Sequence, residues 1–106
     1  MEDFDVEIQD EKDSTPEHIN GSVASAGSPE IKSPTSTKQI QAAMIKNPSK
    51  GVNSNNINDV LYISTDAGTT YFSVTRGEVA VFPGVYADIR IDASSSGVNY
   101  EMVIWS

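Results

Sequence analysis

The chain has no cysteine, a single histidine and few basic residues, and each scarcity excludes a class of site. Of its 106 residues, seven are Lys or Arg and fifteen are Asp or Glu. Without cysteine, no disulfide, thiolate zinc site or cysteine nucleophile can form. Without a basic face, the chain cannot neutralise a phosphate backbone, so we expect no nucleic-acid partner. No apolar run is long enough to span a bilayer and the acidic start is no Sec signal peptide, so we expect no membrane partner.

Charge and aromatic residues are unevenly spread along the chain. Residues 1–30 contain nine of the fifteen acidic residues and one base, whereas residues 31–106 contain six of each sign. The net charge of -8 therefore falls on the first thirty residues. Seven of the eight aromatic residues lie beyond residue 60. This contrast predicts two regions, a flexible acidic N-terminal arm over residues 1–37 and an antiparallel β domain over residues 38–106.

The predicted arm has a composition that opposes independent folding. Residues 10–37 contain three prolines, two glycines and many hydroxyl side chains, and their few aliphatic residues have no periodicity. Such a segment cannot bury enough apolar surface to offset about 1–2 kcal/mol of backbone entropy per residue. At its start, Phe4, Val6 and Ile8 alternate with acidic residues as a short strand would. We interpret these three as candidate interface anchors on a neighbouring subunit, and the alternative is a solubilising tail.

The second region shows the alternation and turns of a β protein. Ile40, Ala42 and Met44 alternate with polar or small residues, and residues 47–51 follow with turn chemistry, which favours a strand over a helix. The asparagine-rich residues 52–58 predict a shaped loop, because asparagine bonds its own main chain. Further strands are expected at residues 60–64, 70–74, 78–82, 86–92 and 98–105. The fold class is therefore all-β, a small antiparallel β-sandwich or barrel of about six strands.

Alternation places a dozen apolar side chains on one face of these strands, and we predict that they form the core. They are Leu61, Ile63, Phe72, Val74, Val79, Val81, Ala87, Ile89, Ile91, Tyr100, Met102 and Ile104. A core this small, without disulfides and with open sheet edges, is marginal in a monomer, so we expect a homo-oligomer. Tyr62, Tyr86 and Trp105 fall on the opposite face and are candidate interface residues, since Tyr and Trp are enriched in interface hot spots. Sugar stacking is the alternative use of these three rings.

Candidate catalytic groups are sparse and poorly arranged for chemistry. His18 falls within the predicted arm, whereas a catalytic histidine needs an ordered, partly buried site. Asp66 and Gly68 suit a hairpin turn better than a calcium loop, because the spacing of an EF-hand is absent. Asp88 and Asp92 share one face of a strand and are interpreted as a solvated face rather than a glycosidase pair. We therefore expect no enzyme, no catalytic residue, no metal site and no cofactor.

The order of the turns along residues 38–106 resembles that in known virion proteins. A basic residue, glycine and glutamate precede a strand at Arg76–Glu78, and an Ala-Ser-Ser-Ser-Gly turn at residues 93–97 joins the last two strands. This order resembles the small β-sandwich modules in structural proteins of tailed bacteriophages. The resemblance implies a non-enzymatic capsid decoration or neck or tail accessory protein, located in the virion. Its β domain would form a homo-oligomer, and its arm would bind neighbouring capsid, neck or tail subunits. The alternative function is a carbohydrate- or receptor-binding β module of a phage or bacterial surface.

Overall fold

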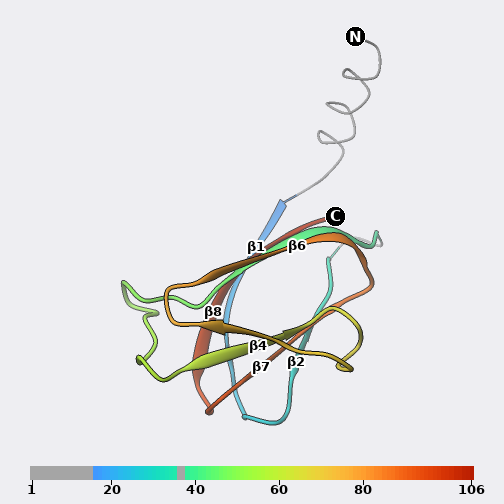
Figure 1. Cartoon of the computed structure of the whole chain (residues 1–106). Coiled ribbons are helices and arrows are strands. Elements are labelled where there is room, and N and C mark those ends of the chain that lie inside the picture. The colour runs from blue at the N-terminus through green and yellow to red at the C-terminus, as the bar shows by residue number, and fades with distance from the viewer. Residues whose placement is uncertain (1–15, 36–37) are drawn as a thin grey trace.

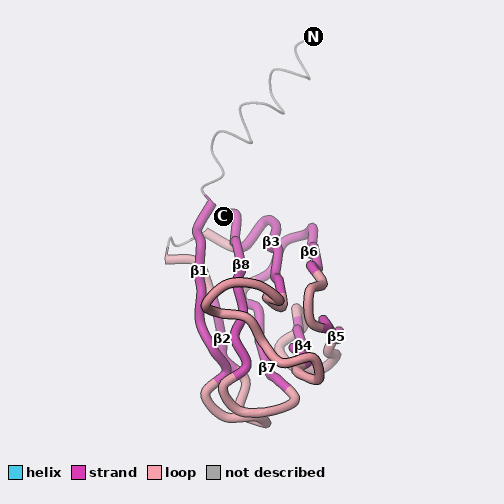
Figure 2. Tube along the Cα trace, turned by 90° about the vertical axis from the view of Figure 1, so that its left-hand side faces the viewer, coloured by secondary structure: helices cyan, strands magenta, loops and turns pink. Residues whose placement is uncertain are grey.

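The computed structural model describes residues 16–35 and 38–106, which form two stacked antiparallel sheets of four strands each. Sheet A contains, in spatial order, β1 (Pro16–Val23), β8 (Val98–Trp105), β3 (Ile40–Lys46) and β6 (Val79–Tyr86). Sheet B contains β2 (Glu30–Lys32), β7 (Ile89–Ala93), β4 (Val60–Ser64) and β5 (Phe72–Thr75). Figures 1 and 2 show the two layers, with no helix among the described residues. The all-β sandwich prediction is confirmed, with eight strands within residues 16–35 and 38–106 in place of about six.

The core lies between the two sheets and is built mostly of β-branched and other aliphatic side chains. Its fully buried large members are Tyr100, Ile40, Ile45, Leu61, Ile63, Ile89, Ile91, Ile104, Val23, Val74 and Val98. Eight of the twelve residues predicted for the core are buried there: Leu61, Ile63, Val74, Ile89, Ile91, Tyr100, Met102 and Ile104. The strand prediction for Ile40–Met44 is also confirmed, since β3 lies at the centre of sheet A.

The predicted boundary between residues 37 and 38 is wrong, because residues 16–35 are part of the sandwich. β1 pairs with β8 along its whole length, from Pro16 opposite Trp105 to Val23 opposite Val98, and β2 pairs with β7. Pairing with these neighbours and burial of Val23 stabilise backbone whose own composition is unfavourable for a strand. The predicted anchors Phe4, Val6 and Ile8 lie outside the described residues.

β6 presents the opposite face to the core from the one predicted. Val79 and Val81 are 50% and 63% exposed, whereas Ala80 and Phe82 pack against the core. Gly77 determines which side chains of β6 point toward the core. It has a φ of 85°, and both its amide and the Glu78 carbonyl are hydrogen-bonded to the same residue, Asn47. One extra residue is thereby inserted into the strand, as in a β-bulge. Apolar side chains occupy both faces of β6, so alternation alone could not select the inward one.

Two other predicted core residues also lie at the surface. Ala87 follows the last residue of β6 and is exposed. Phe72 sits on edge strand β5 and is 53% exposed, although its ring lies 5.9 Å from that of Phe82 across the gap between the sheets. Both positions are apolar in sequence, but neither has a strand beyond it to complete its burial.

A buried asparagine network closes one end of the sandwich, and the prediction of a shaped loop is confirmed. The Asn47 side chain is fully buried and donates to the carbonyls of Asp59 and Val74, each at 2.9 Å. Asn55 donates to the Asn47 side-chain oxygen at 2.7 Å and exchanges bonds with the main chain of Asn99. Buried amides that are fully bonded in this way specify one loop conformation.

Candidate interaction surface

The outer face of sheet A changes from polar to apolar between its two edges. Strand register places Trp105 between Pro16 and Ala42, Val103 between His18 and Met44, and Glu101 between Asn20 and Lys46. On β1 the outward side chains are His18, Asn20 and Ser22, whereas on β6 they are Val79, Val81 and Pro83. Val85, further along β6, is 66% exposed. The apolar side of this face therefore lies along β6, which is an edge strand.

Within the part of the chain that the structure describes, β6 also has main-chain groups that no neighbouring strand pairs with. Asn47 forms a hydrogen-bonded position with Gly77 and Glu78. Because hydrogen-bonded and non-hydrogen-bonded positions alternate along an antiparallel pair, the main-chain groups of Ala80 and Phe82 point toward β3. The main-chain groups of Val79 and Val81 then point away from the sheet. We call residues 79–81, with their exposed side chains and free backbone, the β6 edge. Such an edge is a template for pairing with another segment.

The far end of β6 is closed to pairing. Pro83 has no amide hydrogen, and its position in the ladder is one whose main chain points outward. Its carbonyl accepts a 2.6 Å hydrogen bond from the Tyr86 hydroxyl. Within β6, only the β6 edge can therefore pair with an added strand. It is long enough to bind a short extended segment, and Pro83 prevents longer pairing that could extend the sheet through many copies.

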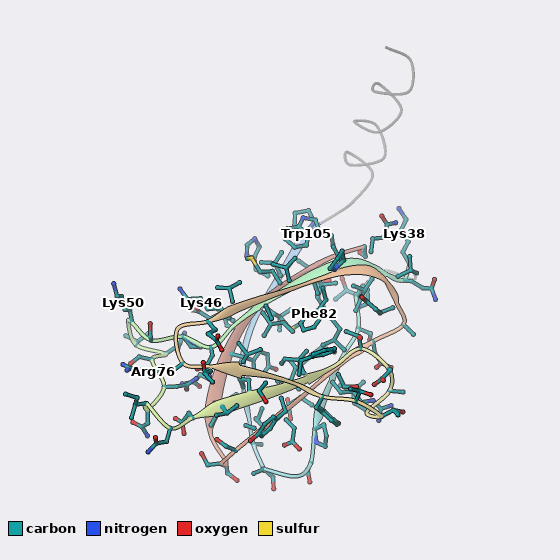
Figure 3. All side chains as sticks on the ribbon, viewed as in Figure 1. Lys38, Lys46, Lys50, Arg76, Phe82 and Trp105 are labelled. Carbon is teal, nitrogen blue, oxygen red and sulfur yellow. The ribbon has the colours of Figure 1, made fainter. Side chains whose placement is uncertain are left out.

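Three cationic side chains lie at the Val79 end of the β6 edge. Lys46 is opposite Val79, Lys50 is in the loop after β3, and Arg76 is in the turn before β6. Figure 3 shows these three side chains at the same end of the molecule, opposite Lys38. Within residues 16–35 and 38–106, none of the three forms an ion pair with a carboxylate. We call them the basic cluster; Arg76 also donates a 3.3 Å hydrogen bond to the Ser49 carbonyl, and the charge of all three is available to an acidic partner.

The carboxylate nearest in sequence to Arg76 is occupied locally. Glu78 accepts hydrogen bonds from both the amide and the hydroxyl of Thr75. These bonds, the hydroxyl's first, lower the pKa of Glu78 below its ordinary value. Glu78 is thus held within its own turn as an anion.

A shallow hollow of about 320 Å³ lies on the outer face of sheet A, toward β1. It is lined by His18, Asn20, Met44, Lys46, Glu101, Met102 and Val103. Trp105 occupies the next outward position along β8 after Val103 and is partly exposed. Figure 3 shows its ring on the side of sheet A away from the core. The hollow thus combines hydrogen-bonding groups with an adjacent indole ring.

The three aromatic residues predicted for an interface come to three different places. Trp105 lies on the outer face of sheet A, and Tyr62 lies on the outer face of sheet B, opposite Asp92 and Ser73. Tyr86 is a correction, because its ring packs against the core while its hydroxyl bonds to Pro83. The three rings therefore do not form one stacking platform.

The acidic residues considered for chemistry are engaged in turns and local pairs. Asp66 accepts hydrogen bonds from the Thr70 amide and the Ser64 hydroxyl, which lower its pKa, and the hairpin-turn prediction is confirmed. Asp88 lies 3.7 Å from Arg90 Nε, and Asp92 accepts from the Gly27 amide at 2.9 Å. No group of His, Asp or Glu in the described part of the chain is arranged to hold a metal ion.

Sequence reasoning missed the β6 edge and the basic cluster. The two valines were assigned to the core because their period-two spacing is that of a buried face. The three cations are scattered in sequence, at 46, 50 and 76, and only the loop and the bulge bring them to one end of the sheet. The bulge could have been anticipated from the glycine of Arg76–Glu78, which suits a left-handed turn position.

Comparison of the chain with protein-family models, with curated proteins and with solved structures found no match. Among the residues that the structure describes, no helix could cross a membrane.

Proposed function

We propose that the protein is a non-enzymatic virion structural subunit, of the capsid decoration or neck or tail accessory type. The observation that carries the proposal is the β6 edge, where free main-chain groups adjoin valines that are 50% and 63% exposed. Apolar side chains beside an unpaired strand are typical of a surface that a partner covers. The likeness of the turn order to phage β modules supports placing that partner in a virion.

Self-association through the β6 edge is the first part to test. Val81→Lys places a charge at the centre of the edge, and we expect sedimentation equilibrium to show at least tenfold weaker self-association than in the unchanged chain. Ser22→Lys is the matched control, because it adds the same charge at an outward position of the other edge strand of sheet A. A chain that stays monomeric at all concentrations, or equal effects of the two variants, would contradict assembly through this edge.

Residence in a virion needs a separate measurement. Mass spectrometry of gradient-purified particles from cells that carry the gene should detect the protein in multiple copies per particle. Its absence from those particles, with the protein present in the same cells, would reject the virion assignment.

A second candidate function is carbohydrate or receptor binding, and the hollow beside Trp105 is the observation that favours it. Sugars bind where an aromatic face adjoins hydrogen-bonding groups, as here with His18, Asn20 and Glu101. A glycan array with Trp105→Ala as the control tests this function, since specific binding that disappears in the variant would favour it over assembly.

A further inference from the structure

The surface formed by the β6 edge and the basic cluster is apolar in the middle and cationic at one end. Val79 and Val81 present their side chains on the outer face, and their main chain is unpaired by β3. Lys46 lies opposite Val79, with Lys50 and Arg76 at the same end, and none of the three forms an ion pair among the described residues. An extended peptide that alternates apolar residues and carries carboxylates fits this surface, because strand addition uses main-chain bonds for affinity and side chains for specificity.

Residues 1–13 of the same sequence have that chemistry. They contain seven acidic residues and one lysine, and Phe4, Val6 and Ile8 alternate with acidic residues between them. At about 3.3 Å per residue the thirteen residues span roughly 40 Å when extended, which exceeds the length of the whole β6 strand. Both the charge and the length therefore suit the described surface.

A neighbouring copy is the better source of this segment than the same chain. Pro16 begins β1, which is separated from β6 by β8 and β3. To reach its own β6 edge, the segment would cross the outer face with its acidic residues over Val103 and Met44. Placing carboxylates over apolar groups costs free energy that a segment arriving from outside avoids.

We infer that residues 4–8 of a second copy bind the β6 edge as an added strand, with flanking carboxylates on the basic cluster. This inference rests on the proposed assembly function and names the segment that performs it. Binding would cover Val79 and Val81 and neutralise Lys46, Lys50 and Arg76 together. Because residues 4–8 and the β6 edge are different surfaces, each copy can give its segment to one neighbour and accept another's, which closes a ring when the rotation permits.

Intermolecular paramagnetic relaxation enhancement tests this contact in the full chain. The chain has no cysteine, so Asp5→Cys carries a single nitroxide. The labelled chain is mixed with ¹⁵N-labelled chain of unchanged sequence. We expect selective broadening of the Val79 and Val81 amide signals, at least severalfold above that of β1 amides, and its loss in about 1 M NaCl, where charges are screened.

Two variants with the same change in net charge separate the basic cluster from a general charge effect. The first combines Lys46→Gln, Lys50→Gln and Arg76→Gln, and the second combines His18→Glu, Asn20→Glu and Ser22→Glu on the opposite edge. We expect the first set to weaken the contact about tenfold, as the loss of three exposed ion pairs implies, and the second to leave it intact.

Two results would overturn the inference: broadening centred on another surface of the ¹⁵N-labelled chain, or no broadening. If Val81→Lys still prevents self-association while the Asp5 label remains far from β6, the β6 edges of two copies pair with each other. The inference about residues 4–8 then fails, and the assembly function stands. If the chain is monomeric and the label broadens nothing on any partner, the assembly function fails as well.

Discussion

The two edge strands of sheet A have equal length and opposite character. β1 and β6 are eight residues each. β1 turns His18, Asn20 and Ser22 outward, and the next strand along the chain, β2, is only three residues long. β6 turns Val79 and Val81 outward and contains Pro83 at the next outward position of its ladder. The difference teaches that the β1 edge presents polar side chains suited to solvent. The β6 edge presents apolar side chains and unpaired main-chain groups, which suit assembly.

The two edges are also held to the core by different means. On the β1 side, Gly21 packs against the buried Tyr100 ring, whose hydroxyl lies close to Lys32 of β2. On the β6 side, the Asn47 main chain bonds to the main chain of Gly77 and Glu78, while its side chain donates to the carbonyl of Val74 in β5. An aromatic ring therefore supports one edge, whereas the other edge is held by main-chain bonds from Asn47, the residue whose side chain anchors the buried amide network.

Removing the aromatic support of the β1 side should have the largest effect. Tyr100 is 1% exposed, and Tyr100→Ala should lower the free energy of unfolding by about 3–5 kcal/mol, as truncation of a buried aromatic ring does. Tyr62→Ala is the matched control on the outer face of sheet B and should cost under about 1 kcal/mol. Chemical denaturation of both variants measures the difference. Equal losses would show that Tyr100 does not support β1 and β2 in the way described.

Removing the buried amide side chain of Asn47, whose main chain pairs with the start of β6, should cost somewhat less. Asn47→Ala leaves the Val74 and Asp59 carbonyls and the Asn55 amide without their partner, so we expect a loss on the order of 2–4 kcal/mol. Asn58→Ala, in the same loop but exposed, should change the free energy of unfolding by less than about 0.5 kcal/mol. Denaturation curves that coincide for the two variants would contradict this role of Asn47.

The contact between β1 and the core can be tested at a single methyl group. A Cβ at position 21 would lie 2.6 Å from the Tyr100 hydroxyl and 2.9 Å from its Cζ, so Gly21→Ala should destabilise the fold by about 1–3 kcal/mol. Adding Tyr100→Phe removes the closest atom and should recover part of that loss. A thermodynamic cycle of the two single variants and the double variant measures the coupling. Strict additivity would mean that β1 does not press on this ring.

The stability of the β6 side should fall in acid and that of the β1 side in alkali. These are the smallest effects of this series. The pKa of Glu78 is lowered below 4.5 by Thr75, so its stabilising contribution is present above that value and is lost as pH falls through the folded pKa. The pKa of Lys32 is raised above 10.5, chiefly by its hydrogen bond to Tyr100. Its contribution is therefore present below 10.5 and is lost as pH rises through the folded pKa.

Local opening measured by NMR at each extreme checks these signs. Thr75→Val should reduce the acid sensitivity of the turn before β6, and Tyr100→Phe should reduce the alkaline sensitivity of β2. A β2 signal that loosens only in acid would contradict the assignment for Lys32.

The contrast between β1 and β6 also explains how far sequence reasoning reaches in this fold. β4, β7 and β8 were predicted because β-branched residues alternate within each and turns separate them. β1 was missed because His18, Asn20 and Gly21 are poor strand formers, and its stability comes from pairing with β8, about eighty residues away in sequence. β6 was predicted as a strand with the wrong face inward, because the bulge at Gly77 shifts the strand by one residue and turns Val79 and Val81 outward.

The candidate surface likewise has one part that short stretches of sequence reveal and another part that only the folded sheets bring together. The acidic, alternating residues 4–8 are evident in sequence, and their role as interface anchors stays a prediction. The surface proposed to bind them depends on three cations gathered from separate segments and on valines that the bulge turns outward. Such a surface exists only after the two sheets have formed.

Amide hydrogen exchange at Val79 and Val81, followed as the protein concentration rises, tests the central proposal most directly. In the single chain, the amides of both residues point away from β3 and should exchange rapidly. Assembly through the β6 edge predicts at least tenfold slower exchange at concentrations where sedimentation shows the oligomer, with no change in the outward amides of β1. Unchanged exchange at Val79 and Val81 in a fully formed oligomer would contradict the account.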